Sequence, residues 1–173
     1  LHYPLRRQRQ MCIRDSIGAD TLFNNTAPTS SVFSLDDDSS VNSNGGSFVA
    51  YCWGEVPGYS KFGAYRGNSS SSNGSYIHLG FRPSFVIIKK FSGSDSWQMH
   101  DSARQDYNNK SAALFPSSAD AEQTSGRLID FLSNGFKFYN ADGNTNEDGH
   151  DYVYFAWAET AGQTPYGTFA NAR

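Results

Sequence analysis

The chain has 173 residues, of which 14 are basic and 17 acidic, and its formal net charge is −3. Aromatic residues make up 15% of the sequence and polar turn formers are frequent, which is typical of many short strands joined by polar turns. It contains no run of about 18 apolar residues, so we expect no membrane insertion.

The first sixteen residues, LHYPLRRQRQMCIRDS, are the most basic part of the chain. One allowed back-translation resembles a transposase sequencing-library adapter read in frame, without a break up to Asp15 and into Ser16. We therefore predict that residues 1–16 are a disordered adapter artefact, with biological sequence from about Ile17. A genuine basic tail, equally disordered, is the alternative.

Without residues 1–16 the chain is more acidic. Four arginines and one aspartate leave the count, so basic residues fall from 14 to 10, acidic residues from 17 to 16, and the net charge from −3 to −6. No basic patch remains to neutralise phosphates, and we expect no nucleic-acid partner. Cys52 becomes the only cysteine, which excludes an intrachain disulfide and a zinc site; we expect it to be a small buried residue.

The chain matches itself at a shift of 104 residues. Residues 30–65 align without gaps on residues 134–169. The aligned pairs include Asn42 with Asn146, Gly45 with Gly149, Trp53 with Trp157, and Glu55 with Glu159. We predict tandem units of about 104 residues, with 17–58 the C-terminal part of a truncated first repeat and 59–173 a complete one.

The complete repeat contains seven runs that predict short strands, because they are rich in β-branched and aromatic residues and end at polar turns. The runs are 62–67, 75–81, 84–91, 97–101, 127–132, 136–140 and 152–159. Residues 102–126 are polar and irregular, and 118–124 is the best candidate for a single helical turn. The fold class is therefore all-β: an antiparallel β-sandwich or jelly roll.

The run at 152–159 is apolar on both faces. Val153, Phe155 and Trp157 alternate with alanines, and the aligned segment of the first copy shows the same alternation. A strand that is apolar on both faces is typical of a central, covered position in a sheet. We predict that position for both copies of the segment.

His100, Asp101 and Ser102 are the three residue types of a hydrolase triad. Neighbouring residues on a strand point to opposite faces, so the triplet cannot bring a nucleophile, a base and an orienting carboxylate together by itself. We interpret it as a strand end followed by a turn and expect no catalytic residues.

The segment 142–149 resembles the first half of a calcium loop, in which alternate oxygen ligands meet the cation. Its candidate ligands are Asp142, Asn144, Asn146 and Asp148. No bidentate Glu follows at the required spacing, and the positions aligned with 144, 146 and 148 carry no carboxylate in the first copy. We therefore expect no metal and no cofactor, with turn-forming side chains as the explanation and calcium at these residues as the alternative.

Two glutamates, Glu55 and Glu159, occupy the same position at the end of the central strand of each copy. A carboxylate there can accept backbone N–H bonds from the following turn. A glycoside hydrolase needs a second carboxylate at a defined distance, which the sequence does not identify, so a structural role is favoured over a catalytic one. Aromatic residues able to stack on sugars, but more typical of core packing, are Trp97, Tyr76 and Tyr139.

Three motifs carry a family resemblance: AYCWGEVPGYSKFGAYRGN, GFRPSFVIIKK and IDFLSNGFKFYNADGNTNEDGHDYVYFAWAE. They resemble a recurrent domain of unknown function in predicted virion proteins of marine tailed phages, and the resemblance extends from Leu22 to Arg173. It implies a structural or tail-fibre-like virion component and assigns no catalytic or binding residue.

We therefore expect a non-enzymatic phage virion module, displayed on the particle and contributing to adhesion to host-surface glycans. The expected partners are other virion proteins and a host glycan, with an oligomer as a further option. The alternatives are a glycan hydrolase and a carbohydrate-binding module that a bacterium secretes or displays on its surface.

Overall fold

The computed structural model describes residues 24, 26, 28–93, 95–105 and 107–159. Contacts divide the chain into two compact units, Leu1–Trp53 and Gly54–Arg173. The expected disordered tail at 1–16 lies outside the described residues, as does the end of the complete repeat at 160–173.

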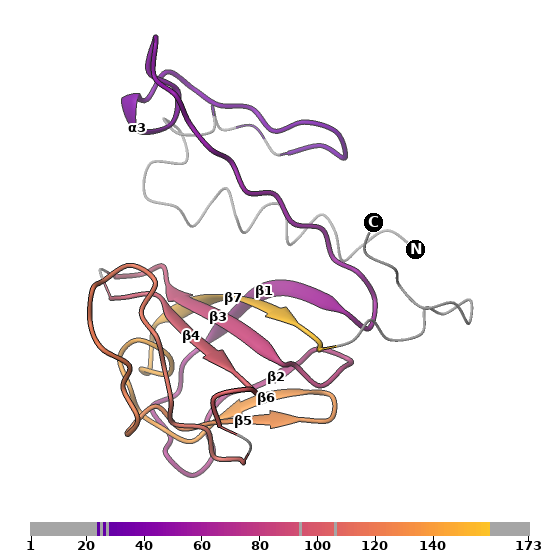
Figure 1. Cartoon of the computed structure of the whole chain (residues 1–173), viewed down its shortest axis with the longest axis vertical. Helices are drawn as coiled ribbons and strands as arrows, with labels where there is room; N and C mark the ends of the chain where they lie inside the picture. The colour runs from indigo at the N-terminus through magenta and orange to yellow at the C-terminus, as the bar shows by residue number, and fades with distance from the viewer. Residues whose placement is uncertain (1–23, 25, 27, 94, 106, 160–173) are drawn as a thin grey trace. The chain divides into compact units, whose positions relative to one another are not determined.

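The second unit is an antiparallel β-sandwich (Figure 1). Its seven strands are β1 (Ser60–Arg66), β2 (Tyr76–His78), β3 (Phe85–Lys90), β4 (Gln98–Asp101), β5 (Ile129–Leu132), β6 (Gly135–Phe138) and β7 (Asp151–Trp157). One sheet has the order β1-β7-β3-β4 and the other the order β2-β6-β5. Each strand overlaps one of the seven predicted runs, so the all-β prediction is confirmed.

Strand β7 is central in the four-stranded sheet, as predicted. On one side it pairs antiparallel with β1, Phe62 opposite Phe155. On the other side it pairs antiparallel with β3, Ile87 opposite the same Phe155. In this sheet β1 and β7 therefore lie side by side, although most of the unit's sequence separates them.

The core lies between the inner faces of the two sheets. Tyr65 of β1 stacks on Phe138 of β6, with ring centroids 5.2 Å apart, and Phe136 contacts Tyr154 edge-on at 5.6 Å. Residues with no exposed surface come from both sheets: Val86, Ile88, Ile129, Phe131, Phe136, Phe138, Tyr152 and Ala156. Burial of these side chains is the main contribution to stability.

The other face of the four-stranded sheet is half-buried. Phe155 and Trp157 of β7 lie against the ring of Phe62, with centroids 5.7 and 5.5 Å away. The ring centroid of Trp97 lies 6.1 Å from that of Phe155, and the ring centroid of Phe85 lies 5.6 Å from that of Trp157. Both faces of β7 are thus apolar as predicted, but only the core face is fully buried.

Three local predictions are wrong. Residues 118–124 form no helix; the one helix among the described residues is α3 (Ser39–Asn42), a single turn capped by the side chain of Asp38. The segment 47–53 of the first copy forms no strand, and Cys52 is exposed instead of buried. A lone extended segment cannot bury its side chains without neighbouring strands. No helix in the described part of the chain is long and apolar enough to span a membrane.

The sandwich should depend strongly on Phe136, which is fully buried between the sheets. Phe136→Ala is expected to lower the free energy of unfolding by about 3–5 kcal/mol, because it leaves a cavity in the core. Urea denaturation measures the loss. The matched control is Tyr107→Ala, since Tyr107 is 82% exposed; equal losses for the two variants would contradict the assigned core.

Candidate functional site

A polar cluster surrounds the buried side chain of Lys90. Along β3 the residues alternate, so that Val86, Ile88 and Lys90 all face the core. Lys90 is the last residue of the strand and only 5% exposed. A buried ammonium group needs charged partners, and it finds them in two loops at this end of the sandwich.

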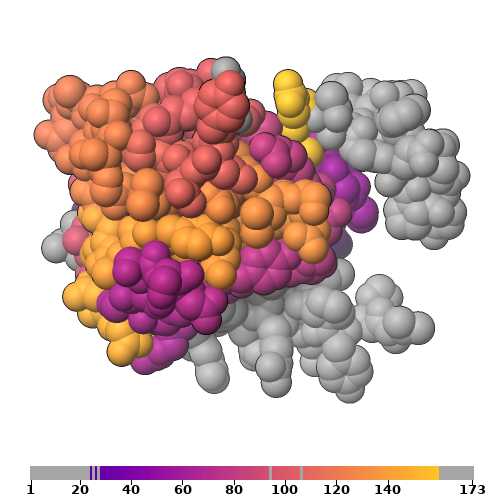
Figure 2. Space-filling view, turned by 90° about the horizontal axis from the view of Figure 1, so that it is seen from below, coloured from indigo at the N-terminus to yellow at the C-terminus, as the bar shows by residue number. Residues whose placement is uncertain are grey.

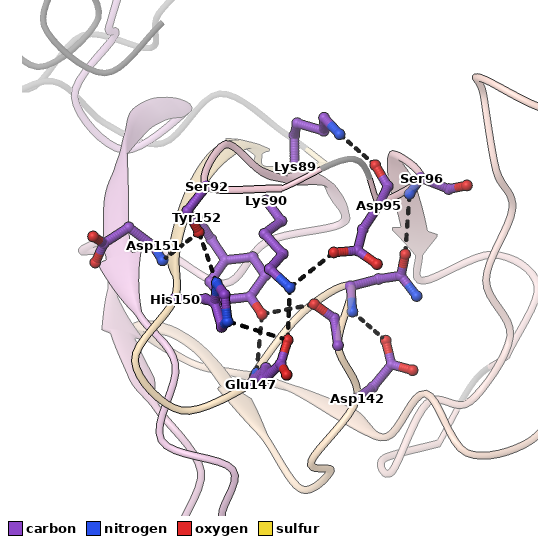
Figure 3. A network of polar contacts seen from close by, with 12 residues as sticks. Lys89, Lys90, Ser92, Asp95, Ser96, Asp142, Glu147, His150, Asp151 and Tyr152 are labelled. Carbon is purple, nitrogen blue, oxygen red and sulfur yellow. Dashed lines mark hydrogen bonds and ion pairs between the residues drawn. The ribbon is translucent and has the colours of Figure 1, made fainter. Parts of the chain in front are cut away.

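Two carboxylates bind the ammonium group (Figure 3). The Nζ atom of Lys90 lies 2.8 Å from Oδ2 of Asp95 and 2.6 Å from Oε2 of Glu147. Both hydrogen bonds raise the pKa of Lys90, and the bond to Asp95 has the larger effect. The hydrogen bond from Lys90 lowers the pKa of Glu147.

Strand β7 holds the loop that carries Glu147. The backbone N–H of Glu147 donates to Oη of Tyr152 at 2.9 Å, and the Tyr152 hydroxyl donates to the carbonyl oxygen of Gly143 at 2.7 Å. Nε2 of His150 lies 3.6 Å from Oε2 of Glu147, and Nδ1 of His150 lies 3.0 Å from Oγ of Ser92 (Figure 3). The cluster therefore joins the turn after β3 to the loop before β7.

This geometry fits a structural clamp better than a catalytic site. A lysine acts as a nucleophile or base when its pKa is lowered, whereas the pKa of Lys90 is raised. Both of its carboxylate partners are engaged with the same cation. Among the described residues, no group of three or more His, Cys, Asp or Glu side chains is placed to hold a metal ion.

The calcium-loop candidates are close in sequence but their oxygens serve the loop itself. Asp142 accepts N–H bonds from the backbone of Asn144 at 2.9 Å and from the side chain of Gln98 at 3.2 Å, and it pairs with Arg127. Oδ1 of Asn144 accepts from the backbone of Ser96 at 3.1 Å. The bond from Asn144 to Asp142 is that of an Asx-type turn.

Asn146 and Asp148, the other two candidates, do not converge on a common point. Asn146 is fully buried, and its amide donates to the carbonyl oxygen of Asn140 at 2.6 Å. Asp148 is exposed, and its backbone N–H donates to Oγ of Ser69 at 2.7 Å. Figure 2 shows the purple loop after β1, which contains Ser69, against the orange-yellow segment before β7.

His100 and Asp101 lie on opposite faces of β4, and Ser102 follows the end of that strand. His100 is buried in the core, where its Nε2 lies 3.2 Å from Oε1 of Gln98. Asp101 instead forms an ion pair with Arg104. Burial lowers the pKa of His100 to about 4, so the imidazole is neutral near pH 7.

Glu55 accepts a backbone N–H bond, as expected for a structural glutamate, but the bond comes from β1 and not from the following turn. Its Oε1 accepts the backbone N–H of Phe62 on the outer edge of β1, at 3.2 Å. Burial and the charge of Glu55 together raise the pKa of Tyr154 to about 12, and burial has the larger effect. Glu159 is exposed, and the segment aligned with β1 that follows it lies outside the described residues.

The possible sugar-stacking aromatics are scattered. Trp97 is half-buried against the outer sheet face, and Tyr139 lies beneath the Lys137 ammonium, 5.2 Å from its ring centroid. Tyr76 is 45% exposed, and its hydroxyl donates to Oδ1 of Asn134 at 2.8 Å. The three residues do not form a shared platform among the described contacts.

Sequence reasoning missed Lys90 and Asp95. The alternation of 84–91 contained the signal, since a strand that buries Val86 and Ile88 also directs the side chain of residue 90 inward. Its partner carboxylates lie in loops, whose positions depend on the whole fold.

The loops before 47–53 and before β7 have the same internal structure. Asp38 and Asp142 each accept the backbone N–H two residues on, at 2.8 and 2.9 Å. Asn42 and Asn146 each donate their side-chain amide to the carbonyl oxygen six residues back, at 2.8 and 2.6 Å. Two aligned glycines share a positive φ: Gly45 at 77° and Gly149 at 79°.

The fold places the second unit in the class of antiparallel β-sandwich domains. Residues 12–161 match the family described as Domain of unknown function (DUF7483), and the chain belongs to that family. The match starts inside the segment 1–16 and runs across the boundary expected between 58 and 59. No curated protein and no solved structure shows a significant match.

The clamp predicts an asymmetric response to substitution. Asp95→Asn combined with Glu147→Gln leaves a buried ammonium group without a carboxylate, and should destabilise the protein more than Lys90→Met, which frees two part-exposed carboxylates to meet water. Urea midpoints compare the variants. Asp151→Asn, which removes an exposed ion pair with Arg66, should change the midpoint little. A larger loss for Lys90→Met than for the double variant would contradict the clamp.

His100 predicts a pH dependence of stability. Its pKa of about 4 in the folded chain lies below the ordinary value of 6.5, so the unfolded chain binds more protons between these limits. The free energy of unfolding should therefore fall by about 3 kcal/mol from pH 7 to pH 4 through this group alone. Urea titrations across that range measure the fall.

The control for this pH dependence uses two histidines. His100→Gln should flatten the fall between pH 6.5 and 4, whereas substitution of the exposed His78 by Gln should leave it unchanged. A fall of equal size in all three proteins would show that His100 is not its source.

Proposed function

We propose that this protein is a non-enzymatic phage virion module, structural or tail-fibre-like, that is displayed on the particle and contributes to adhesion to host-surface glycans. The observation that best supports this proposal is that the buried polar side chains bind other groups of the fold. Lys90, Asp142 and His100 are each engaged within the fold rather than arranged around a common reaction centre. The resemblance to predicted tailed-phage virion proteins supplies the biological setting.

The proposal includes tandem repetition. Units of about 104 residues, with 17–58 the end of one repeat and 59–173 the next, suit an extended appendage in which each sandwich has its own core. The matching loops at 36–46 and 140–150 support this division. We further propose that residues 1–16 derive from a sequencing adapter and play no part in the function.

The test is the location of the protein in its source sample. Phage particles purified on a density gradient should contain peptides from residues 17–173, co-sedimenting with capsid proteins, when analysed by mass spectrometry. A packaging enzyme of the same phage, which leaves the finished particle, is the control and should be absent from that fraction.

Recovery of the peptides only from bacterial cells or the secreted fraction would contradict the virion assignment and favour a bacterial carbohydrate-binding module. The full chain should also release no new reducing ends from bacterial surface polysaccharides. Release of reducing ends would instead support the glycan hydrolase alternative.

A further inference from the structure

The segment 47–53 has the sequence pattern of a central strand but a very different environment from β7. Its residues SFVAYCW align with DYVYFAW of β7. Phe48 is 48% exposed and Tyr51 is 76% exposed, whereas Tyr152, aligned with Phe48, has no exposed surface. Val49 is 78% exposed. An apolar run of this kind left in water indicates an interaction surface.

The preceding loop fixes which residues correspond. Residues 36–46 and 140–150 share their backbone hydrogen bonds, their Asp cap, their Asn side-chain bond and a glycine with positive φ. The shift of 104 residues therefore describes local geometry as well as sequence. Residues 47–53 leave this loop where β7 leaves its own.

The known neighbours of β7 define what such a strand requires. It pairs antiparallel with β1 on one edge and with β3 on the other, and Tyr152, Tyr154 and Ala156 face the core. In the first copy the aligned inward residues are Phe48, Ala50 and Cys52. The first and last positions match in kind, an aromatic and a small residue, whereas Ala50 stands where β7 has Tyr154.

The strand nearest to this segment in the sequence is β1, and other residues already occupy the outer edge of β1. Val56 pairs with Ser60, and the carboxylate of Glu55 accepts the N–H of Phe62, both on the outer edge of β1. A charged side chain that occupies an edge N–H is one way to block addition of a further strand. The segment 47–53 thus ends just before the residues that cap β1.

We propose that residues 47–53 form the central strand of a further β-sandwich of the same family, inserted between a β1-like and a β3-like strand. The partner is another unit of this fold, joined on the N-terminal side of the segment. The inserted strand would direct Phe48, Ala50 and Cys52 into that unit's core. The inference concerns the interface between units and holds whether or not the protein is a virion component.

A hairpin between residues 47–53 and β1, with strand pairing in place of the Glu55 contact, would bury residue 51 instead of residue 52. If the Val56–Ser60 bridge extended into a hairpin, Tyr51 would lie beside Tyr65 on the core side, and Cys52 would lie beside Ala64 on the outer side. The two arrangements therefore differ in which of residues 51 and 52 is buried.

Thiol reactivity at residue 52 tests the proposal. The first protein is the full chain with Cys12→Ser, so that Cys52 is its only thiol. The second has a copy of residues 59–138 in place of residues 1–34, which supplies β1 to β6 ahead of the 36–46 loop. Cys52 should react freely with Ellman's reagent in the first protein and about tenfold or more slowly in the second, with full reactivity restored in urea.

A matched variant of the second protein carries Tyr51→Cys and Cys52→Ser, which moves the thiol to the outer face. It should react clearly faster than the Cys52 form. Equal and fast reaction at both positions would overturn the proposal, because the segment would then lie outside any sheet. Protection at 51 with free reaction at 52 would overturn it in favour of the hairpin.

Discussion

The pairing of β7 with strands on both of its edges is the constraint on which the rest of the structure depends. It joins residues 60–66 to residues 151–157 and places β3 on the other side. The inner face of β7 then packs on β6, through contacts such as Phe136 with Tyr154. The aligned segment 47–53 forms no strand, so its sequence pattern alone does not produce one.

The polar cluster follows from the same pairing. Lys90 lies opposite Tyr152 in the β3–β7 register, so the buried ammonium group comes next to the loop that leads into β7. Tyr152 holds the backbone of Glu147, and Glu147 binds Lys90. These side chains, which sequence patterns did not single out, thus stabilise loops at one end of the sandwich.

Short-range patterns were sufficient to predict the strands. The residue content of 84–91 and 152–159 predicted two strands, and the structure pairs them in one sheet as β3 and β7. The same patterns failed at Cys52, because burial depends on partners distant in the chain, and at 118–124, which form no helix. The Lys90 clamp was also out of reach, since Asp95 and Glu147 come together only when β3 and β7 pair.

Hydrogen–deuterium exchange of the full chain at neutral pH most directly tests the claim that flanking strands, rather than the sequence of the strand itself, hold it in place. The amides of β7 are expected to be among the slowest to exchange, opening only with global unfolding, while those of 47–53 exchange at nearly the rate of an unstructured peptide. Equal protection of the two segments, or exchange of β7 before β5 and β6, would contradict the account.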